Sequence, residues 1–397
     1  MKPKPLSLYL HIPFCTKKCD YCDFVSFDDK CSQIDSYIDA LCNEIKSYRE
    51  RCTGHVVGTI FVGGGTPSLL DTKQIDRLFR AIRDAFVIED DAEITIECNP
   101  SSITAAKLTT YKRVGINRIS LGIQSYDTFE LKTLGRAQTT ESVFRALARI
   151  NDAGFDNVSI DLIYNIPLPR EVALSGMRRN ISYEVGYIFH KAPFIKHVSA
   201  YALIPEDDTP MMERLDYEEL LELDEDSAIN EELDLYNAIH AQGLRRYEVS
   251  NWARPGYESR HNKMYWAADA EYLGLGLNAS GLFNDERYTN TDDLGMYLLN
   301  PNKVIKQEVR PRDRVVNEII MLGLRTKYGI DLRKLERYGV DLVREKTKEI
   351  MQLREHKLLT ITKNKIKATT DGMYILNMLI EMLTFDKEAF ESNGAEE

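Results

Sequence analysis

Three cysteines near the start of the chain have the spacing of a metal-binding loop. They lie in Cys15-Thr16-Lys17-Lys18-Cys19-Asp20-Tyr21-Cys22, a C-x3-C-x2-C run, whereas the other cysteines of the seven are scattered. An odd number of cysteines in a chain of 397 residues argues against a disulfide framework. Three thiolates can hold three irons of a cubane cluster and leave the fourth iron open to another ligand. The run therefore predicts a [4Fe-4S] cluster on Cys15, Cys19 and Cys22.

A structural zinc site is the alternative for these cysteines. Such a site needs four Cys or His ligands in a closed tetrahedron. His11 lies four residues before Cys15, but within a strand-like pattern. The scattered cysteines are interpreted as core residues; Cys42, for example, continues the apolar face of a predicted helix. The cluster is therefore favoured over zinc.

The elements that must position the cysteines alternate regularly through the first half of the chain. Amphipathic helical patterns separate six strand-like runs: Ser7–His11, Thr59–Val62, Glu93–Cys98, Arg118–Ile123, Asn157–Leu162 and His197–Leu203. Gly115 and Gly154 stand where two of the helices should end. Alternation of this kind is typical of an α/β fold with a parallel sheet. Six units predict a partial (β/α)6 barrel, open on one side, with its chemistry at the carboxyl ends of the strands.

The pattern changes after about residue 215. Residues 216–242 predict a long acidic helix, and Tyr247–Asn251 predicts a strand. From about residue 303 we expect helices and one hairpin, formed by Leu358–Thr362 and Lys365–Thr369, in a smaller α+β domain of winged-helix type. We expect disorder over residues 391–397. The predicted parts are a barrel, an accessory α/β extension and the winged-helix-like domain, over residues 1–215, 216–300 and 301–397.

Composition narrows the classes of partner. A hydrophobic fraction of 43% and a charged fraction of 28% fit a globular protein, and no apolar run approaches the length of a membrane span. The net charge of −11 argues against nucleic-acid binding, although Lys363, Lys365 and Lys367 lie in the predicted hairpin. The basic N-terminus lacks a small-residue cleavage site, so we expect a cytoplasmic protein.

Several motifs together resemble the radical S-adenosylmethionine family. The cysteine loop follows the first predicted strand, where that family carries it. The resemblance is narrower to the oxygen-independent coproporphyrinogen oxidase-like branch, over about residues 6 to 290. The motifs that carry it are Tyr9-Leu10-His11-Ile12-Pro13-Phe14-Cys15, Phe61-Val62-Gly63-Gly64-Gly65-Thr66-Pro67, Asn117-Arg118-Ile119-Ser120-Leu121-Gly122-Ile123-Gln124-Ser125 and Asp161-Leu162-Ile163-Tyr164.

The resemblance implies that S-adenosylmethionine binds the open iron and the strand ends. The residue types fit this implied role, because glycines permit close backbone approach to a ligand and polar groups that end buried strands need partners. In this family the amino and carboxylate groups of S-adenosylmethionine chelate the iron. The residues implied to contact it are Tyr9, Tyr21, Gly64, Gly65, Thr66, Glu97, Gln124, Arg136 and Asp161.

Two features distinguish the branches of the family. Phe24 stands where coproporphyrinogen oxidases are expected to carry a fourth cysteine. His261-Asn262-Lys263-Met264-Tyr265-Trp266 resembles the H-N-x-x-Y-W pattern of HemW-type heme chaperones. That resemblance implies His261 as a heme contact, and a buried core histidine is the alternative. Gln138 and Asn165 depart from the family pattern, which shows histidine and glycine there.

The leading hypothesis is a HemW-like protein that binds the cluster, S-adenosylmethionine and heme and delivers heme to an acceptor protein. The alternative is an oxygen-independent coproporphyrinogen III oxidase, which decarboxylates propionate side chains. Radical chemistry would need an electron donor such as flavodoxin or ferredoxin. A third hypothesis, a cluster-containing regulator that uses the winged module, is disfavoured by the acidic net charge.

Overall fold

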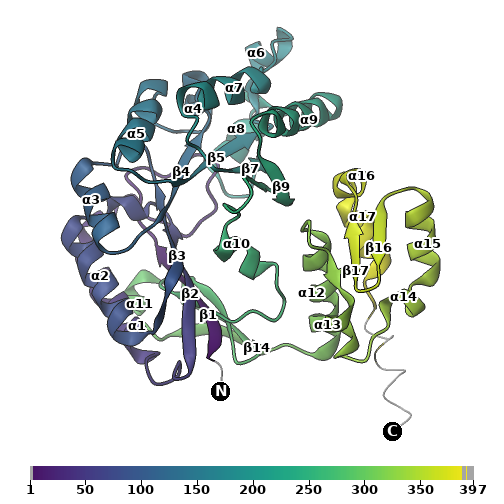
Figure 1. Ribbon diagram of the computed structural model, residues 1–397. Coiled ribbons are helices and arrows are strands. Elements are labelled where there is room, and N and C mark those ends of the chain that lie inside the picture. Colours follow the sequence, from purple (N-terminus) through teal and green to yellow (C-terminus); the bar gives the residue numbers. More distant parts are fainter. Residues whose placement is uncertain (1–2, 387–389, 391–397) are drawn as a thin grey trace.

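A computed structural model describes residues 3–386 and residue 390. One large sheet runs through the chain, and Figure 1 shows helices on its outer face and a separate C-terminal unit beside it. The sheet has twelve strands in the order β14-β13-β12-β11-β1-β2-β3-β4-β5-β7-β10-β9. The predicted disorder of residues 391–397 lies outside the described residues.

Six adjacent strands of this sheet form its parallel core. The bounds are β1 (Lys4–Ile12), β2 (His55–Gly64), β3 (Ile88–Cys98), β4 (Arg118–Gln124), β5 (Asn157–Tyr164) and β7 (His197–Ala202), each parallel to the next. Each corresponds to one of the six predicted runs. The helices between them are α1 (Ile34–Ser47), α2 (Thr72–Ala85), α3 (Ala105–Arg113), α4 (Thr128–Thr133), α5 (Thr140–Asp152), α6 (Arg170–Leu174) and α7 (Ile181–Lys191). The predicted partial (β/α)6 barrel is confirmed.

Local sequence explains why these elements form. Asp71 caps α2 by accepting hydrogen bonds from the amides of Lys73 and Gln74, while the Gln74 side chain accepts from the Asp71 amide. The helix ends that Gly115 and Gly154 predict are confirmed, since both adopt positive φ, 87° and 73°. In β4 the apolar residues Ile119, Leu121 and Ile123 are fully buried in the core that the helices cover. The alternate residues of β4 therefore face the barrel interior.

The edges of the sheet are antiparallel extensions. On one side β10 (Asn251–Ala253) pairs with β7, and β9 (Arg245–Glu248) pairs with β10. On the other side β11 (Tyr272–Leu275) lies parallel to β1, followed by β12 (Ser280–Phe283), β13 (Glu286–Asn290) and β14 (Val304–Val309). The single strand predicted at Tyr247–Asn251 is therefore wrong: a turn divides it between two strands. The helix expected from about residue 303 is also replaced at its start by β14.

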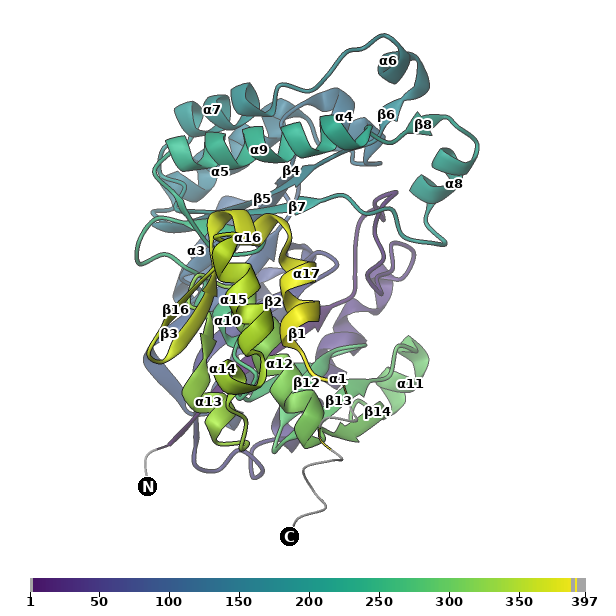
Figure 2. The ribbon, with the colours of Figure 1, turned by 90° about the vertical axis from the view of Figure 1, so that its right-hand side faces the viewer.

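The long acidic helix predicted over residues 216–242 is shorter than expected. Helix α8 (Pro210–Asp216) ends where that helix should begin, and β8 (Leu220–Leu221) pairs with β6 (Leu168–Pro169). Helix α9 (Glu225–Ala241) starts only after Asp224, whose side chain accepts a hydrogen bond from the Ser227 amide at 2.9 Å. Figure 2 shows α9 lying along α7, and both helices contact each other. Acidic composition alone did not locate these breaks.

The C-terminal domain has its own hydrophobic core. It contains α12 (Arg312–Leu324), β15 (Ile330–Asp331), α13 (Leu332–Glu336), α14 (Leu342–Glu345), α15 (Thr347–Glu355), β16 (Leu359–Thr362), β17 (Lys365–Ala368), α16 (Thr370–Tyr374) and α17 (Leu376–Leu383). Its sheet has the order β15-β17-β16, so the predicted hairpin is confirmed within a winged-helix arrangement. Two further helices belong to the large unit: α10 (Arg260–Tyr265) contacts β2, and α11 (Leu294–Leu299) packs on α1 with Leu294 and Tyr297 in the barrel core.

The division at residues 215 and 300 stays a prediction. The large sheet contains strands from both sides of each boundary, since β9, β10 and β14 all belong to it. Within the described part of the chain, no helix is long and apolar enough to cross a membrane.

Candidate functional site

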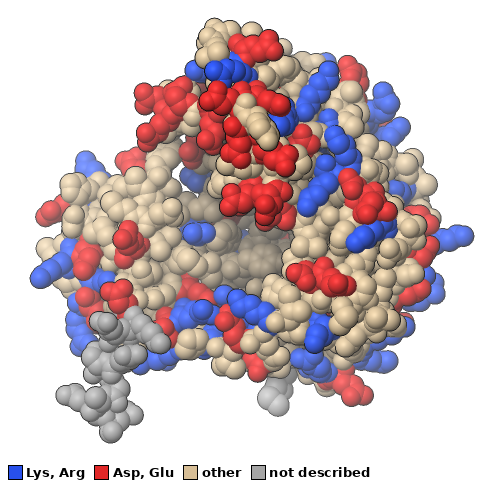
Figure 3. All heavy atoms as spheres, turned by 180° about the vertical axis from the view of Figure 1, so that it is seen from behind, with Lys and Arg blue, Asp and Glu red and all other residues tan. Residues whose placement is uncertain are grey.

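The cysteine loop follows β1 and is closed by backbone hydrogen bonds. The Cys15 amide donates to the Phe27 carbonyl at 2.9 Å, and the Phe27 amide donates to the Pro13 carbonyl at 2.8 Å. Cys15, Cys19 and Cys22 are free thiols that line one cavity of about 610 Å³. This volume lies in the range of small-molecule sites. Figure 3 shows that one face of the molecule is hollowed at its centre.

The arrangement of the thiols fits a cubane cluster better than a single ion. In residues 3–386 and 390, no three His, Cys, Asp or Glu side chains are grouped so that they could hold one metal ion. A cubane does not require such a group, because each thiolate binds a different iron. Three thiols on one loop that line one cavity therefore fit the donor set of a cluster with one open iron.

The glycine run at the end of β2 permits close packing below this loop. A Cβ atom at Gly65 would lie 2.8 Å from the Phe14 carbonyl oxygen and 3.0 Å from the Cys15 sulfur. Gly64 has φ of 112°, a conformation that favours glycine, and its amide donates to Glu97 Oε2 at 3.0 Å. Thr66 follows, with its hydroxyl 3.6 Å from the Cys15 sulfur. The run therefore positions a cavity wall against the cysteines.

Polar residues of three neighbouring strands, β3, β4 and β5, line the same cavity. Glu97, Gln124 and Asp161 all line the cavity. Burial, and then the charge of Asp161, raises the pKa of Glu97 to about 8. Burial likewise raises the pKa of Asp161, whose Oδ1 accepts a hydrogen bond from the Ser120 hydroxyl at 3.1 Å. Gln124 has φ of 63°, an uncommon conformation for a residue other than glycine.

Arg136 joins the cysteine loop to the barrel wall. Its guanidinium donates to the Gly122 carbonyl at 3.2 Å and to the Tyr21 hydroxyl at 3.1 Å, and it lies 3.6 Å from the Cys19 sulfur. Arg136 and Tyr21 both line the cavity. One cation thus fixes the loop relative to the end of β4 and brings positive charge to the thiols.

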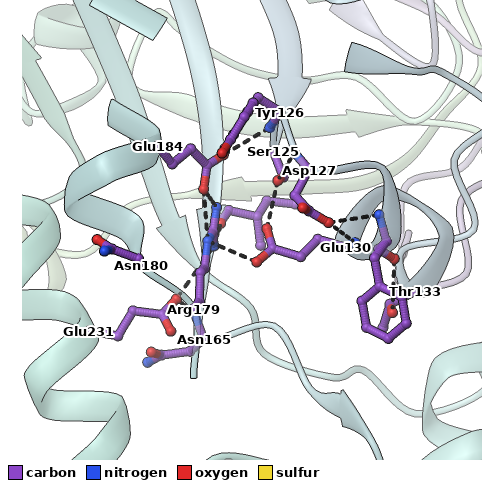
Figure 4. Close-up of polar contacts among 12 residues, drawn as sticks. Ser125, Tyr126, Asp127, Glu130, Thr133, Asn165, Arg179, Asn180, Glu184 and Glu231 are labelled. Atoms are coloured by element: carbon purple, nitrogen blue, oxygen red, sulfur yellow. Dashed lines mark hydrogen bonds and ion pairs between the residues drawn. The ribbon is translucent and has the colours of Figure 1, made fainter. Parts of the chain in front are cut away.

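Figure 4 shows a buried charge cluster beside the loop that follows β4. Arg179 pairs with Glu130, Glu184 and Glu231, and each of these four side chains is at most 11% exposed. Glu184 also accepts a hydrogen bond from the Tyr126 amide at 2.8 Å, directly after the Gln124-Ser125 turn. The cluster therefore ties α4, α7 and α9 to the loop that follows β4.

The two departures from the family pattern have structural roles nearby. Gln138 is buried, and its Nε2 donates to the Ile123 carbonyl at 2.6 Å. Asn165 has φ of 57°, and its amide donates to Glu231 at 3.0 Å. Both contacts support the ends of β4 and β5.

Tyr9 and His261 lie outside the lining of the cavity. The Tyr9 hydroxyl is 3.0 Å from His11 Nδ1, and its ring stacks on Phe61. His261 is 1% exposed, with Nδ1 2.8 Å from the Thr59 hydroxyl and Nε2 3.0 Å from the Tyr265 hydroxyl. Burial lowers the pKa of His261 to about 3, so the ring is neutral. Both ring nitrogens have protein partners, which is the buried core arrangement rather than an open axial position.

Several cavity residues escaped the sequence analysis. Asn262, the neighbour of His261 in the same motif, lines the cavity, as do Arg118, Ser199 and Tyr201. Arg118 shares the inward face of β4 with Ser120 and Gly122. That alternation was the available signal, but it does not tell which polar residues remain unpaired.

Comparison with known proteins supports the sequence resemblance. The chain matches the Radical SAM superfamily over residues 9–171 and the HemN C-terminal domain over residues 311–375. Heme chaperone HemW of Lactococcus lactis is 34% identical over 390 residues, which are 97% of this chain and 99% of that protein. Heme chaperone HemW of Bacillus subtilis is 30% identical over 379 residues, 94% of this chain and 97% of that protein.

A solved structure shows the same fold. Coproporphyrinogen III oxidase (HemN) from Escherichia coli, a radical SAM enzyme, matches with a TM-score of 0.81 over 97% of this chain and 91% of its own, at 22% identity. Heme chaperone HemW of the same species is 35% identical over 300 residues, 73% of this chain and 74% of that protein. Sequence identity of 30% or more to the heme chaperones extends along nearly the whole chain. The chain therefore belongs to the HemW family of heme chaperones within the radical SAM superfamily.

Proposed function

We propose that this protein binds a [4Fe-4S] cluster, S-adenosylmethionine and heme, and delivers heme to an acceptor protein. The observation that carries the proposal is one cavity lined by three thiols, a glycine turn and polar strand ends. Membership of the HemW family supports the heme and acceptor parts. The match to the Radical SAM superfamily implies the cluster and S-adenosylmethionine.

The cavity residues divide the binding of cluster and S-adenosylmethionine between them. Cys15, Cys19 and Cys22 would hold the cluster, whose open iron would accept S-adenosylmethionine as a ligand and which would supply an electron for radical chemistry. Glu97 and Asp161 offer carboxylates to the cationic and hydroxyl groups of that ligand. The other proposed contacts are Tyr21, Gly64, Gly65, Thr66, Gln124 and Arg136, all of which line the cavity. The Tyr9 contact stays a prediction.

The coproporphyrinogen oxidase reaction is the second candidate. The shared fold favours it, but the identity to that enzyme is 22%, against 34% to a heme chaperone. Phe24, which stands in place of a fourth cysteine, is 62% exposed and lines the cavity. An apolar ring at this position suits a flat apolar ligand. The chaperone is the better supported function.

Anaerobic reconstitution tests the cluster. We expect about four irons per chain, and fewer after Cys15→Ala, Cys19→Ala or Cys22→Ala. Cys52→Ala is the matched control, because that cysteine is buried away from the cavity and should leave the iron content unchanged. Equal iron content in all five proteins would contradict the assignment.

Heme transfer is tested with the reconstituted protein. Heme is added first, and an excess of apomyoglobin is then supplied as a model acceptor while absorbance is recorded. We expect the protein to bind heme stoichiometrically and then to transfer it to the acceptor. In a parallel reaction with S-adenosylmethionine and reductant, we expect no decarboxylation of coproporphyrinogen. Decarboxylated product with 5′-deoxyadenosine, and no heme binding, would replace the chaperone with the oxidase.

A further inference from the structure

Arg118 is a buried cation that makes no direct ion pair with a carboxylate among the described residues. Its side chain is 1% exposed, and its Nε atom has no hydrogen-bond partner among residues 3–386 and 390. The other deeply buried arginines behave differently: Arg179 and Arg310 each bind carboxylates directly. A buried charge that lacks a partner is costly, because it gives up hydration without a compensating interaction.

Part of the Arg118 side chain lines the cavity, while its Nε atom is buried. Arg118 lines the cavity together with Asn262, which is contributed by α10. The strand alternation agrees, since Ile119 and Leu121 are buried on the opposite face of β4. A guanidinium and a carboxamide that face the same space present N–H donors in the geometry that a carboxylate accepts.

The backbone of Arg118 lies far from the cluster loop, although its charge reaches Glu97 and Asp161 and opposes the rise in the pKa of both carboxyl groups. Arg118 begins β4, whereas Gln124 ends that strand beside the loop. Because a strand rises about 3.3 Å per residue, the two positions are separated by roughly 20 Å along β4. The carboxylate of S-adenosylmethionine belongs at the iron in this family, which leaves Arg118 for the anionic group of another ligand.

We propose that Arg118, assisted by Asn262, binds a propionate carboxylate of the tetrapyrrole in the cavity. This inference rests on the proposed heme binding and adds the group that orients the ligand. Apolar surface for the macrocycle is available on the same cavity, where Phe24, Tyr201 and Ile204 are 62%, 45% and 69% exposed. An arginine matches a carboxylate with two parallel hydrogen bonds, which a lysine cannot reproduce.

Titration with heme and with heme dimethyl ester tests the inference, because the ester lacks both carboxylate charges. For Arg118→Gln we expect heme binding to weaken about 10- to 100-fold, the loss typical of a charge-assisted hydrogen-bond pair. Ester binding should be unchanged. Arg118→Lys should bind heme with an affinity between those of the wild type and Arg118→Gln. Arg333→Gln, at an exposed site in the C-terminal domain, should bind heme as tightly as the wild type.

A second variant protects the test against misfolding of the buried site. Asn262→Asp leaves Arg118 in place but adds negative charge beside it, so heme binding should weaken while ester binding holds. Equal loss for heme and ester, or unchanged heme binding in Arg118→Gln, would overturn the inference and leave the proposed function intact. Loss of S-adenosylmethionine binding with heme binding retained would also overturn it. Failure of the wild type to bind heme would overturn the proposed function itself.

Discussion

Gly65 is a position where added bulk would press directly on the backbone of the cysteine loop. A methyl group there would meet the Phe14 carbonyl at 2.8 Å and the Cys15 sulfur at 3.0 Å. Backbone atoms cannot move aside as a flexible side chain can, so the cysteine loop itself must shift. The spacing of the three thiols therefore depends on a residue that carries no functional group.

Gly65→Ala should reduce the retained iron and lower the free energy of unfolding by about 1–3 kcal/mol, the usual cost of overpacking. Gly186→Ala in α7 is the control, because a Cβ there meets nothing within 4 Å. Iron analysis after reconstitution and urea unfolding measure the two effects. Full iron retention by Gly65→Ala would show that the loop adapts without loss of the site.

Glu97 gives the site a pH dependence with a defined sign. Burial, and then Asp161, raises its pKa from 4.5 in the unfolded chain to about 8. The folded protein thus holds the proton more tightly, so the stability contributed by this group is complete below about pH 4.5 and is lost as the pH rises through 8. Glutamine cannot ionise and escapes that loss.

Glu97→Gln should therefore gain stability relative to the wild type as the pH rises between about 4.5 and 8, by at most about 1.4 kcal/mol per pH unit. Urea unfolding at several pH values measures the difference. Glu141→Gln, at an exposed position on α5, should show no such gain. Parallel curves for wild type and Glu97→Gln would contradict the raised pKa.

Three helices around the barrel, α4, α7 and α9, are joined through ion pairs to Arg179. Arg179 neutralises three glutamates, two of them from α7 and α9. Burial raises the pKa of Glu130 to about 7, which reduces the charge that the cluster must hold. Because the charge cluster around Arg179 supports the loop after β4, we expect its loss to displace Gln124 and Arg136 as well.

Arg179→Met should destabilise the protein by about 3–5 kcal/mol, since it leaves buried carboxylates without their cation. The exposed pair of Arg170 and Glu218 provides the control, and Arg170→Met should change stability by less than about 0.5 kcal/mol. Urea unfolding compares the two variants. A small effect of Arg179→Met would mean that protonation of the glutamates replaces the arginine.

A second charge cluster, formed by Glu318 and two arginines, lies between the two hydrophobic cores of the chain. Glu318 of α12 accepts from Arg287 of β13 at 2.9 Å and from Arg310 at 3.0 Å. These contacts couple the large sheet to the C-terminal domain. Between the same two units lies a cavity of about 180 Å³, lined in part by Trp266.

Glu318→Gln should weaken this coupling, so that the C-terminal domain unfolds before the barrel. Trp266 fluorescence in a Trp252→Phe background reports on the joint, and far-ultraviolet circular dichroism reports on the whole chain. We expect the two urea transitions to separate. Lys306→Gln, at an exposed position of β14, should leave the two transitions coincident. Coincident transitions in Glu318→Gln would show that packing alone couples the domains.

The sequence by itself determined the six parallel strands, the helix ends at Gly115 and Gly154 and the cysteine loop after the first strand, while cluster binding by its three thiols stays a prediction. These features depend on local patterns: alternation, capping residues and short spacings. The breaks around α9 and the β9–β10 turn were missed, because capping at Asp224 and pairing with β6 and β7 outweigh composition.

Only the tertiary structure decided which polar residues reach the cavity. His261 and Asn262 are neighbours in one motif, yet the first is enclosed by Thr59 and Tyr265 while the second faces the ligand space. The sequence shows Arg118 only as the first residue of a strand, and the barrel places it in the cavity lining with no direct ion pair among the described residues. Partners distant in sequence make these distinctions, and hydrogen bonding of a buried group is settled by contacts that no local pattern contains.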